Sequence, residues 1–375
     1  MRALAAAATA AVAACGVRSP EAPSPPAEIR IVGTERGPSS LRLVVIDEHG
    51  DRLAELMAPA ATAAHDHSAA FSPDGRWVAF VSTRGRGGDL EQTSLWIVPA
   101  AAGAQPHRLT TGDAVEMTPA WTPDGKALVI ASSRDGTFDL WRIAVDLTAV
   151  PPRAGEPVRL THGDGQELSP SIAPDGRIAY TALRLVEGTA ISRIEVLAPD
   201  GAITQRTPGP FDSTPAWSPD GTTLAFASLH LRDGGKADQD IWLVDRSEPR
   251  VALDAPDTDE SGPVWSRDGH WLFSTSTLWA VETPAEPAGP DAAAAKKRRK
   301  LFSAIVHVDL RERPRQVRML VDRAGAVPRL APALAPAHLD EPALRRNPEY
   351  RAELGRILRD AYRRTHSSPE GERSE

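Results

Sequence analysis

Five carboxylates recur at one fixed position along the chain, and they are the residues best placed to do chemistry. Each stands eight residues before the Asp of a recurring Asp-Gly turn, and the set is Asp66, Glu116, Glu167, Asp212 and Glu260. Such oxygens can accept backbone N–H bonds, attract a basic partner, or ligate Ca²⁺. We therefore expect either structural caps or an acidic ring that binds a cation or a basic partner segment. We expect no cofactor, and Ca²⁺ is the alternative that this ring suggests.

Other signs of catalysis or metal binding are weak. His65 and His67 flank Asp66, but alternate residues of a strand share a face while the one between them points away, so these three would not chelate one metal. The sequence has no Gly-x-Ser-x-Gly elbow, no phosphate-binding loop and no dinucleotide fingerprint. We assign no catalytic residue and no metal ligand.

The elements that would position the carboxylates come from an internal repeat. Its turn reads Phe71-Ser72-Pro73-Asp74-Gly75, and the turn Asp recurs at positions 74, 124, 175, 220 and 268, a period of 45 to 51 residues. Pro presets the backbone of such a turn and Gly accepts its left-handed position, so each copy predicts a hairpin tip. Apolar, strand-like runs follow every turn, as at Trp77–Ser82 and Leu95–Val98. Four strands per repeat at this period predict a β-propeller, with most tryptophans packed between blades.

On these turns the chain resembles the TolB-type propeller family, whose blades carry the Ser-Pro-Asp-Gly repeat. The resemblance covers residues 28–337 and implies an all-β, six-bladed propeller of four-stranded antiparallel blades. Five turns are visible; the sixth blade is built from strands before residue 57, and a late segment, 332–336, supplies its inner strand and closes the ring. The carboxylates then lie on the loops entering the innermost strands, at one mouth of the channel.

The amino terminus predicts export and a lipid anchor. Residues 1–14 read as a signal peptide, with a basic start and an apolar run too short to span a bilayer. Val12-Ala13-Ala14-Cys15 resembles the lipobox of bacterial lipoproteins, which implies lipidation of Cys15, the single cysteine. The Pro-rich residues 16–27 then form a tether. An ordinary signal peptide with a chance Cys is the alternative.

Two further segments lie outside the repeat. Residues 275–300 are expected to be an inserted loop ending in a basic run, which is either solvated or in contact with anionic lipid phosphates. Residues 338–375 predict a short C-terminal helix, started by Asn347 and Pro348, followed by a disordered tail.

Composition limits the function. The net charge of −7 argues against a nucleic-acid partner, and we expect a monomer. The lipobox-like segment implies a cell-envelope lipoprotein, anchored in the outer membrane and facing the periplasm. The TolB resemblance implies a protein-binding scaffold for envelope proteins or peptides in envelope integrity. TolB proteins carry an α/β domain before the propeller and are usually soluble, so the partner's identity does not transfer. The alternatives are a metal-dependent lyase or hydrolase acting on a carbohydrate or small molecule in the channel, and a ligand sensor.

Overall fold

A computed structural model describes the chain from residue 30 to residue 331. Within that span it leaves out 37–39, 48–51, 58–63, 87–91, 164, 187–188, 232–236, 247, 255–257, 283–296, 313–314, 316 and 320–329. The signal peptide, Cys15 and the tether lie outside the described residues, as do the closing segment 332–336 and the predicted C-terminal helix. Every regular element among the described residues is a strand, and none of them is a helix long and apolar enough to cross a membrane.

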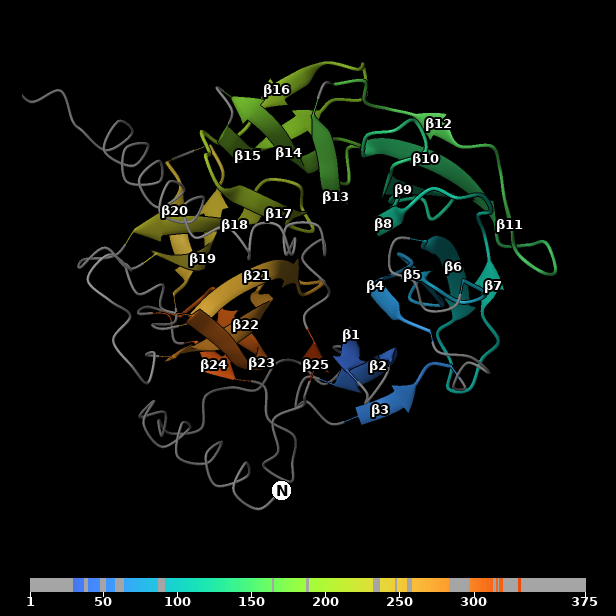
Figure 1. The fold of residues 1–375 in the computed structure, drawn as a ribbon, viewed down its shortest axis with the longest axis horizontal. Helices are drawn as coiled ribbons and strands as arrows, with labels where there is room; N and C mark the ends of the chain where they lie inside the picture. Colours follow the sequence, from blue (N-terminus) through green and yellow to red (C-terminus); the bar gives the residue numbers. More distant parts are fainter. Residues whose placement is uncertain are drawn as a thin grey trace, which may run out of the picture.

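The described strands form six antiparallel sheets arranged around a common centre (Figure 1). The first sheet has the order β25 (Leu330–Ala331), β1 (Arg30–Arg36), β2 (Leu41–Asp47), β3 (Arg52–Glu55). The second contains β4 (Asp66–Phe71), β5 (Trp77–Ser82), β6 (Ser94–Pro99) and β7 (His107–Arg108). The third contains β8 (Glu116–Trp121), β9 (Ala127–Ser132), β10 (Asp139–Asp146), β11 (Arg153–Ala154) and β12 (Val158–Arg159).

The other three sheets repeat the four-stranded order. The fourth is β13 (Gln166–Ile172), β14 (Ile178–Val186), β15 (Thr189–Leu197), β16 (Ile203–Gln205). The fifth is β17 (Asp212–Trp217), β18 (Leu224–Leu231), β19 (Ala237–Val244), β20 (Arg250–Leu253). The sixth is β21 (Thr258–Trp265), β22 (Trp271–Glu282), β23 (Lys297–Asp309), β24 (Arg318–Met319).

The prediction of an all-β propeller with antiparallel four-stranded blades is therefore confirmed in its main feature. Five of the six sheets have the predicted four strands. The third sheet has five strands because β11 and β12 both pair with β10. The two short strands pair with opposite ends of β10, a strand of eight residues that offers more edge than either covers.

The Ser-Pro-Asp-Gly turns are the hairpin tips that the sequence predicts. In the first copy Asp74 Oδ1 accepts bonds from Ser72 Oγ at 2.5 Å and from Arg76 N at 3.0 Å, while Ser72 Oγ accepts from Trp77 N at 3.0 Å. Gly75 has a φ of 71°, in the left-handed region where a Cβ is strained. The carboxylate and hydroxyl thus replace backbone partners inside the turn.

The core lies between the sheets. In one cluster Trp121 and Trp141 of the third sheet pack with Leu95 and Ile97 of the second, and corresponding clusters join the fifth and sixth sheets. Trp121 also donates from its indole nitrogen to Ala70 O, 3.1 Å away on the neighbouring inner strand. These tryptophans therefore fill the layer between blades, as expected for most of them.

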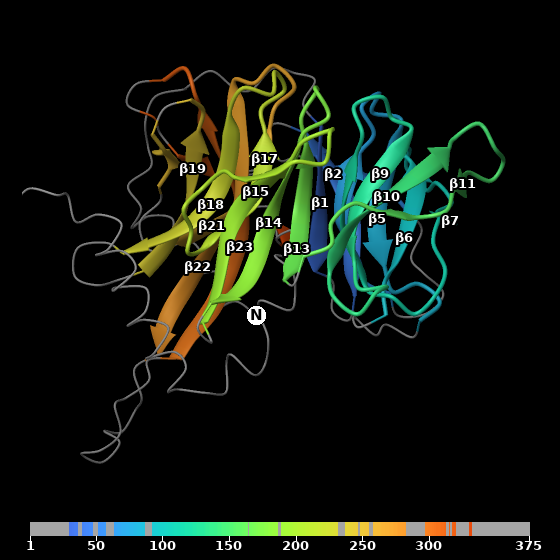
Figure 2. The same ribbon diagram turned by 90° about the horizontal axis from the view of Figure 1, so that it is seen from above.

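Residues 330–331 pair with β1 as β25, with Thr34 opposite Ala331 and Glu35 opposite Leu330, directly before the predicted closing segment 332–336, which lies outside the described residues. One boundary differs from the prediction. The insertion 275–300 is not one loop. Residues 275–282 continue β22 and 297–300 continue β23, and this paired hairpin extends beyond the other sheets on one face (Figure 2).

Candidate functional site

All five repeat carboxylates lie at the start of the inner strands. Each is buried, with 0 to 3% of its surface exposed, and the strands that carry them are β4, β8, β13, β17 and β21. A bulge follows each of them, since the register with the second strand shifts a few residues later, as between His67 and Ala70. The carboxylates therefore face into the sheets and not into solvent.

The bulges share one backbone feature that sequence reasoning missed. The residue two positions after each carboxylate has a left-handed φ between 45° and 61°, and the set is Ser68, Thr118, Ser169, Thr214 and Gly262. Pro follows directly in four of the five copies, at 119, 170, 215 and 263. Because Pro cannot donate to a ladder, it is tolerated in a strand at a bulge or an edge. The recurring Pro was the sequence signal for these bulges.

Asp66 is bound by an arginine of its own sheet. Arg84 Nε lies 2.9 Å from Oδ1 and Arg84 Nη2 lies 2.7 Å from Oδ2, so the pair is bidentate. Ser82, the cross-strand partner of Asp66, adds a hydroxyl bond of 2.6 Å to Oδ1. Both carboxylate oxygens are thereby satisfied within the wall of the propeller.

Glu116 connects two sheets. Its Oε1 lies 2.6 Å from Nη2 of Arg134 in its own sheet, and its Oε2 accepts the backbone N–H of Leu95 at 2.7 Å and the Thr110 hydroxyl, both from the second sheet. Burial raises the pKa of Glu116, and these bonds together with Arg134 oppose that rise. This carboxylate therefore fixes the crossing from one blade to the next.

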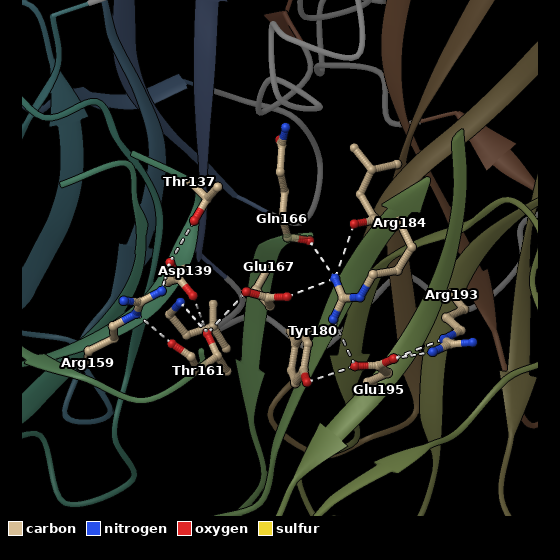
Figure 3. A network of polar contacts seen from close by, with 12 residues as sticks. Thr137, Asp139, Arg159, Thr161, Gln166, Glu167, Tyr180, Arg184, Arg193 and Glu195 are labelled. Carbon is tan, nitrogen blue, oxygen red and sulfur yellow. Dashed lines mark hydrogen bonds and ion pairs between the residues drawn. The ribbon is translucent and has the colours of Figure 1, made fainter. Parts of the chain in front are cut away.

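Glu167 belongs to a larger network of charges (Figure 3). Arg184 lies between two carboxylates, with Nη1 2.8 Å from Glu167 Oε1 and Nη2 3.3 Å from Glu195 Oε2. The Thr161 hydroxyl, from the preceding sheet, is 3.3 Å from Glu167 Oε2 and 3.5 Å from Asp139 Oδ1. Burial raises the pKa of Glu167 and Arg184 lowers it.

Among the described residues, Asp212 is held by hydroxyl and backbone groups and by no arginine. Its Oδ1 accepts the Ser228 hydroxyl at 2.7 Å and its Oδ2 accepts the backbone N–H of Gly209 at 2.9 Å. Burial raises the pKa of Asp212, and bonds from Thr207, Ser228 and Gly209 counteract it.

Glu260 has the least complete set of partners. Its Oε1 accepts the hydroxyls of Thr258 at 2.5 Å and Ser276 at 2.8 Å, whereas no described residue bonds to its buried Oε2. Burial raises the pKa of Glu260 to about 8; the two hydroxyl bonds oppose the rise, and Asp240 and Asp259 add to it.

The predicted site residues thus share a position but are not gathered at one point. Each is engaged by side chains of its own or the preceding sheet, and the described residues contain no group of three or more His, Cys, Asp or Glu that could hold a metal ion. His67 is buried beside Ser68, with Nδ1 3.0 Å from its hydroxyl, and burial lowers the pKa of His67 to about 4. Cation or partner binding by the ring, and the enzymatic alternative, stay predictions.

Three arginines complete this arrangement, and the sequence analysis did not identify them. Arg84, Arg134 and Arg184 each stand two residues after the cross-strand partner of the carboxylate in their sheet. Arg184 lies two residues along β14 from Ala182 and therefore on the same face of that strand, whereas Arg84 and Arg134 lie in the turns just after β5 and β9. The recurrence of Arg at this position was the available signal.

Known proteins resemble the chain over part of its sequence and in its fold. No family model matches the chain. The curated proteins that resemble it include Atu1656 of Agrobacterium fabrum, described as an uncharacterized protein, with 29% identity over 217 residues, which is 55% of this chain and 67% of that one. Another is YuxL of Bacillus subtilis, described as an uncharacterized peptidase, with 24% identity over 221 residues, 58% of this chain but only 30% of that one.

Among solved structures, TolB from Acinetobacter baumannii aligns with a TM-score of 0.52 and 17% identity. The alignment covers 80% of this chain and 65% of that chain. At this identity the similarity shows the fold alone. The chain has a TolB-like propeller, and it spans less than two thirds of the TolB chain and less than a third of YuxL.

Proposed function

We propose that this protein is a lipid-anchored protein of the bacterial cell envelope whose TolB-like propeller is a scaffold for a protein or peptide partner. The observation that carries the proposal is the ring of buried carboxylates. Four of the five have both oxygens engaged by groups of the propeller wall, as for Asp66 and Glu116, so the ring forms a stiff frame around the axis. A rigid, preformed wall lowers the entropy cost of binding a partner.

Small side chains recur at one position of the inner strands. Four residues after each carboxylate stand Ala70, Ala120, Ser171 and Ala216, all partly buried, and Val264, which is 58% exposed. Val264 is the exposed member of this set. We infer that an extended segment of the partner binds along the inner strands, with Val264 in contact with it.

Photo-crosslinking tests this inference with a matched control. Val264 lies on inner strand β21 and Val158 on outer strand β12, with exposed fractions of 58% and 57%. We expect a photoreactive phenylalanine analogue at position 264 to capture one discrete envelope protein in living cells, and the same analogue at position 158 to capture none. Equal capture at both positions, or none at position 264, contradicts the scaffold proposal.

The anchor is a separate part of the proposal and rests on the lipobox-like sequence ending at Cys15. Cells expressing the full chain should incorporate labelled palmitate into it, and the protein should fractionate with the outer membrane. The Cys15→Ser variant should lose both the label and the membrane association. A wild-type chain that takes up no label contradicts the lipoprotein assignment while leaving the crosslinking test untouched.

A further inference from the structure

Two buried acids lie where the third sheet meets the fourth (Figure 3). Asp139 is on β10 and Glu167 on β13, and their side chains are 0% and 1% exposed. The two strands cross closely, because the backbone N–H of Glu167 donates to Phe138 O at 2.7 Å. The boundary between these two blades therefore contains two carboxyl groups that are shielded from solvent.

Each of the two acids binds a guanidinium through one oxygen. Asp139 Oδ2 lies 2.8 Å from Nη2 of Arg159, and Glu167 Oε1 lies 2.8 Å from Nη1 of Arg184. These two ion pairs leave Asp139 Oδ1 and Glu167 Oε2 as the oxygens that require other donors.

The two remaining oxygens depend on the same hydroxyl group. Thr161 Oγ1 lies 3.5 Å from Asp139 Oδ1 and 3.3 Å from Glu167 Oε2. The same oxygen accepts the backbone N–H of Leu140 at 2.9 Å, and a hydroxyl has a single hydrogen to donate. Thr161 can therefore serve only one of the two acids at a time, and a second hydrogen is needed between them.

The charges of the surrounding elements also leave room for one proton. Among the described residues, the ion pairs that extend from Asp139 and Glu167 connect them with three guanidiniums and two more carboxylates. The guanidiniums belong to Arg159 of β12, Arg184 of β14 and Arg193 of β15, and the carboxylates to Asp135 in the turn after β9 and Glu195 of β15. Tyr180 of β14 is neutral and donates to Glu195 at 3.0 Å. Four acids against three bases become neutral when the network holds one proton.

We infer that Asp139 and Glu167 share one proton, and that this proton makes the boundary between the third and fourth blades a pH-sensitive joint. With the proton in place, the protonated acid donates a hydrogen bond to the ionised one and connects the two blades. When the proton leaves, two buried anions repel each other and the crossing of β10 and β13 loosens. The joint does not depend on which partner the propeller binds.

The direction of the pH effect follows from Glu167. Burial raises the pKa of Glu167, the Arg184 guanidinium lowers it, and the neighbouring Asp139 raises it again, with the net result above the ordinary value of 4.5. The folded chain therefore keeps a proton that the unfolded chain has lost. The stabilisation by the shared proton is complete below about pH 4.5 and is lost as the pH rises through the raised pKa.

The boundary between the second and third sheets provides a matched control. Ser94 on β6 has the place of Asp139, because each pairs with the serine that lies opposite the carboxylate of its own sheet. Glu116 has the place of Glu167, and Ser94 Oγ accepts from Nη2 of Arg108 at 2.7 Å. This boundary therefore contains a single buried acid at the corresponding point and no second acid with which to share a proton.

Hydrogen–deuterium exchange of the full-length protein tests the joint, after correction for the intrinsic pH dependence of amide exchange. The readout is the protection of the β13 amides divided by that of the β8 amides, so that changes in global stability and the effect of a single buried acid cancel. We expect this ratio to fall by about tenfold or more between pH 4.5 and pH 8.5. In Asp139→Ser, which copies the control boundary, the ratio should stay constant.

A reciprocal variant keeps the test independent of any folding defect in the first. Ser94→Asp places a second acid beside Glu116, so the β8 amides should then lose protection with rising pH as the β13 amides do. The inference is overturned if the wild-type ratio is the same at both pH values, if it still falls in Asp139→Ser, or if Ser94→Asp leaves the pH profile of β8 unchanged.

Discussion

The ion pair between Arg84 and Asp66 offers a quantitative test of the view that the ring carboxylates hold the propeller together. The Asp66 side chain is 4% exposed and that of Arg84 13%, and the guanidinium reaches both carboxylate oxygens. Replacing Arg84 by Leu leaves a buried carboxylate with a single hydroxyl partner. Breaking a buried pair from one side typically costs about 3–5 kcal/mol, so Arg84→Leu should lower the free energy of unfolding by an amount in this range.

The assay is thermal denaturation followed by circular dichroism at pH 7.5, with a matched exposed pair as the control. Arg76 and Asp74 lie 2.6 Å apart in the first turn, but their side chains are 80% and 42% exposed. Solvent screens such a pair, so Arg76→Leu should leave the melting temperature unchanged. For a domain of this size roughly 2–4 °C correspond to 1 kcal/mol, so Arg84→Leu should melt about 10 °C below the wild type.

The double variant Asp66→Asn/Arg84→Leu completes the cycle. Because it removes the buried charge along with its partner, it should be more stable than Arg84→Leu alone, even though it has lost two side-chain functions. The reasoning is refuted if Arg84→Leu melts with the wild type, or if the double variant is less stable than the single one. Either result would mean that Asp66 is free to act on a ligand.

Three further outcomes follow from the same contacts. Glu260→Gln should flatten the pH dependence of stability. The raised pKa of Glu260 makes the wild type lose stability as pH increases from about 4.5 towards 8, and the loss amounts to about 3 kcal/mol at pH 7. Urea melts of the two proteins should therefore coincide near pH 4.5 and diverge above it. Trp121→Phe removes the hydrogen bond from the indole N–H to Ala70 O, whereas the indole N–H of Trp217 has no described partner. Trp121→Phe should therefore lower the free energy of unfolding by about 1 kcal/mol more than Trp217→Phe does. Equal losses of stability would contradict a stabilising role of this hydrogen bond. Deleting residues 326–375 removes the strand that begins at Leu330 and pairs with β1, so the whole propeller should melt at a lower temperature, and unchanged melting would exclude closure by this strand.

The local structure was readable from the sequence because it depends on short-range chemistry. The hairpin tip is specified by the backbone preferences of Pro73 and Gly75 and by the hydrogen bond from Arg76 N–H to the Asp74 carboxylate two residues earlier. An Asp-Gly turn of this kind recurs five times along the chain. The repeated carboxylates were also readable as a set. The fixed offset from the turn Asp placed them at the entry of the inner strands, where Glu116 and Asp212 indeed begin β8 and β17.

The partners of those carboxylates could not be read in the same way. Arg84 is 18 residues from Asp66, and Thr161 reaches Glu167 from a different sheet, so these contacts exist only once strands are in register and sheets are side by side. The fifth strand of the third sheet was missed for a related reason. β11 and β12 have two residues each, too few to give an alternating pattern.

The sequence by itself determined that the chain folds into repeated antiparallel hairpins and that each carries an acid at one position, because turn preference and strand periodicity act over a few residues. Only the tertiary structure decided what each acid does. Burial removes the carboxylate from water, and the strand register determines which groups lie beside it. A guanidinium binds Asp66, whereas Oε2 of Glu260 has no hydrogen-bond partner among the described residues. A carboxylate at the same offset is thereby bound through both oxygens in one blade and keeps one oxygen without a hydrogen bond in another.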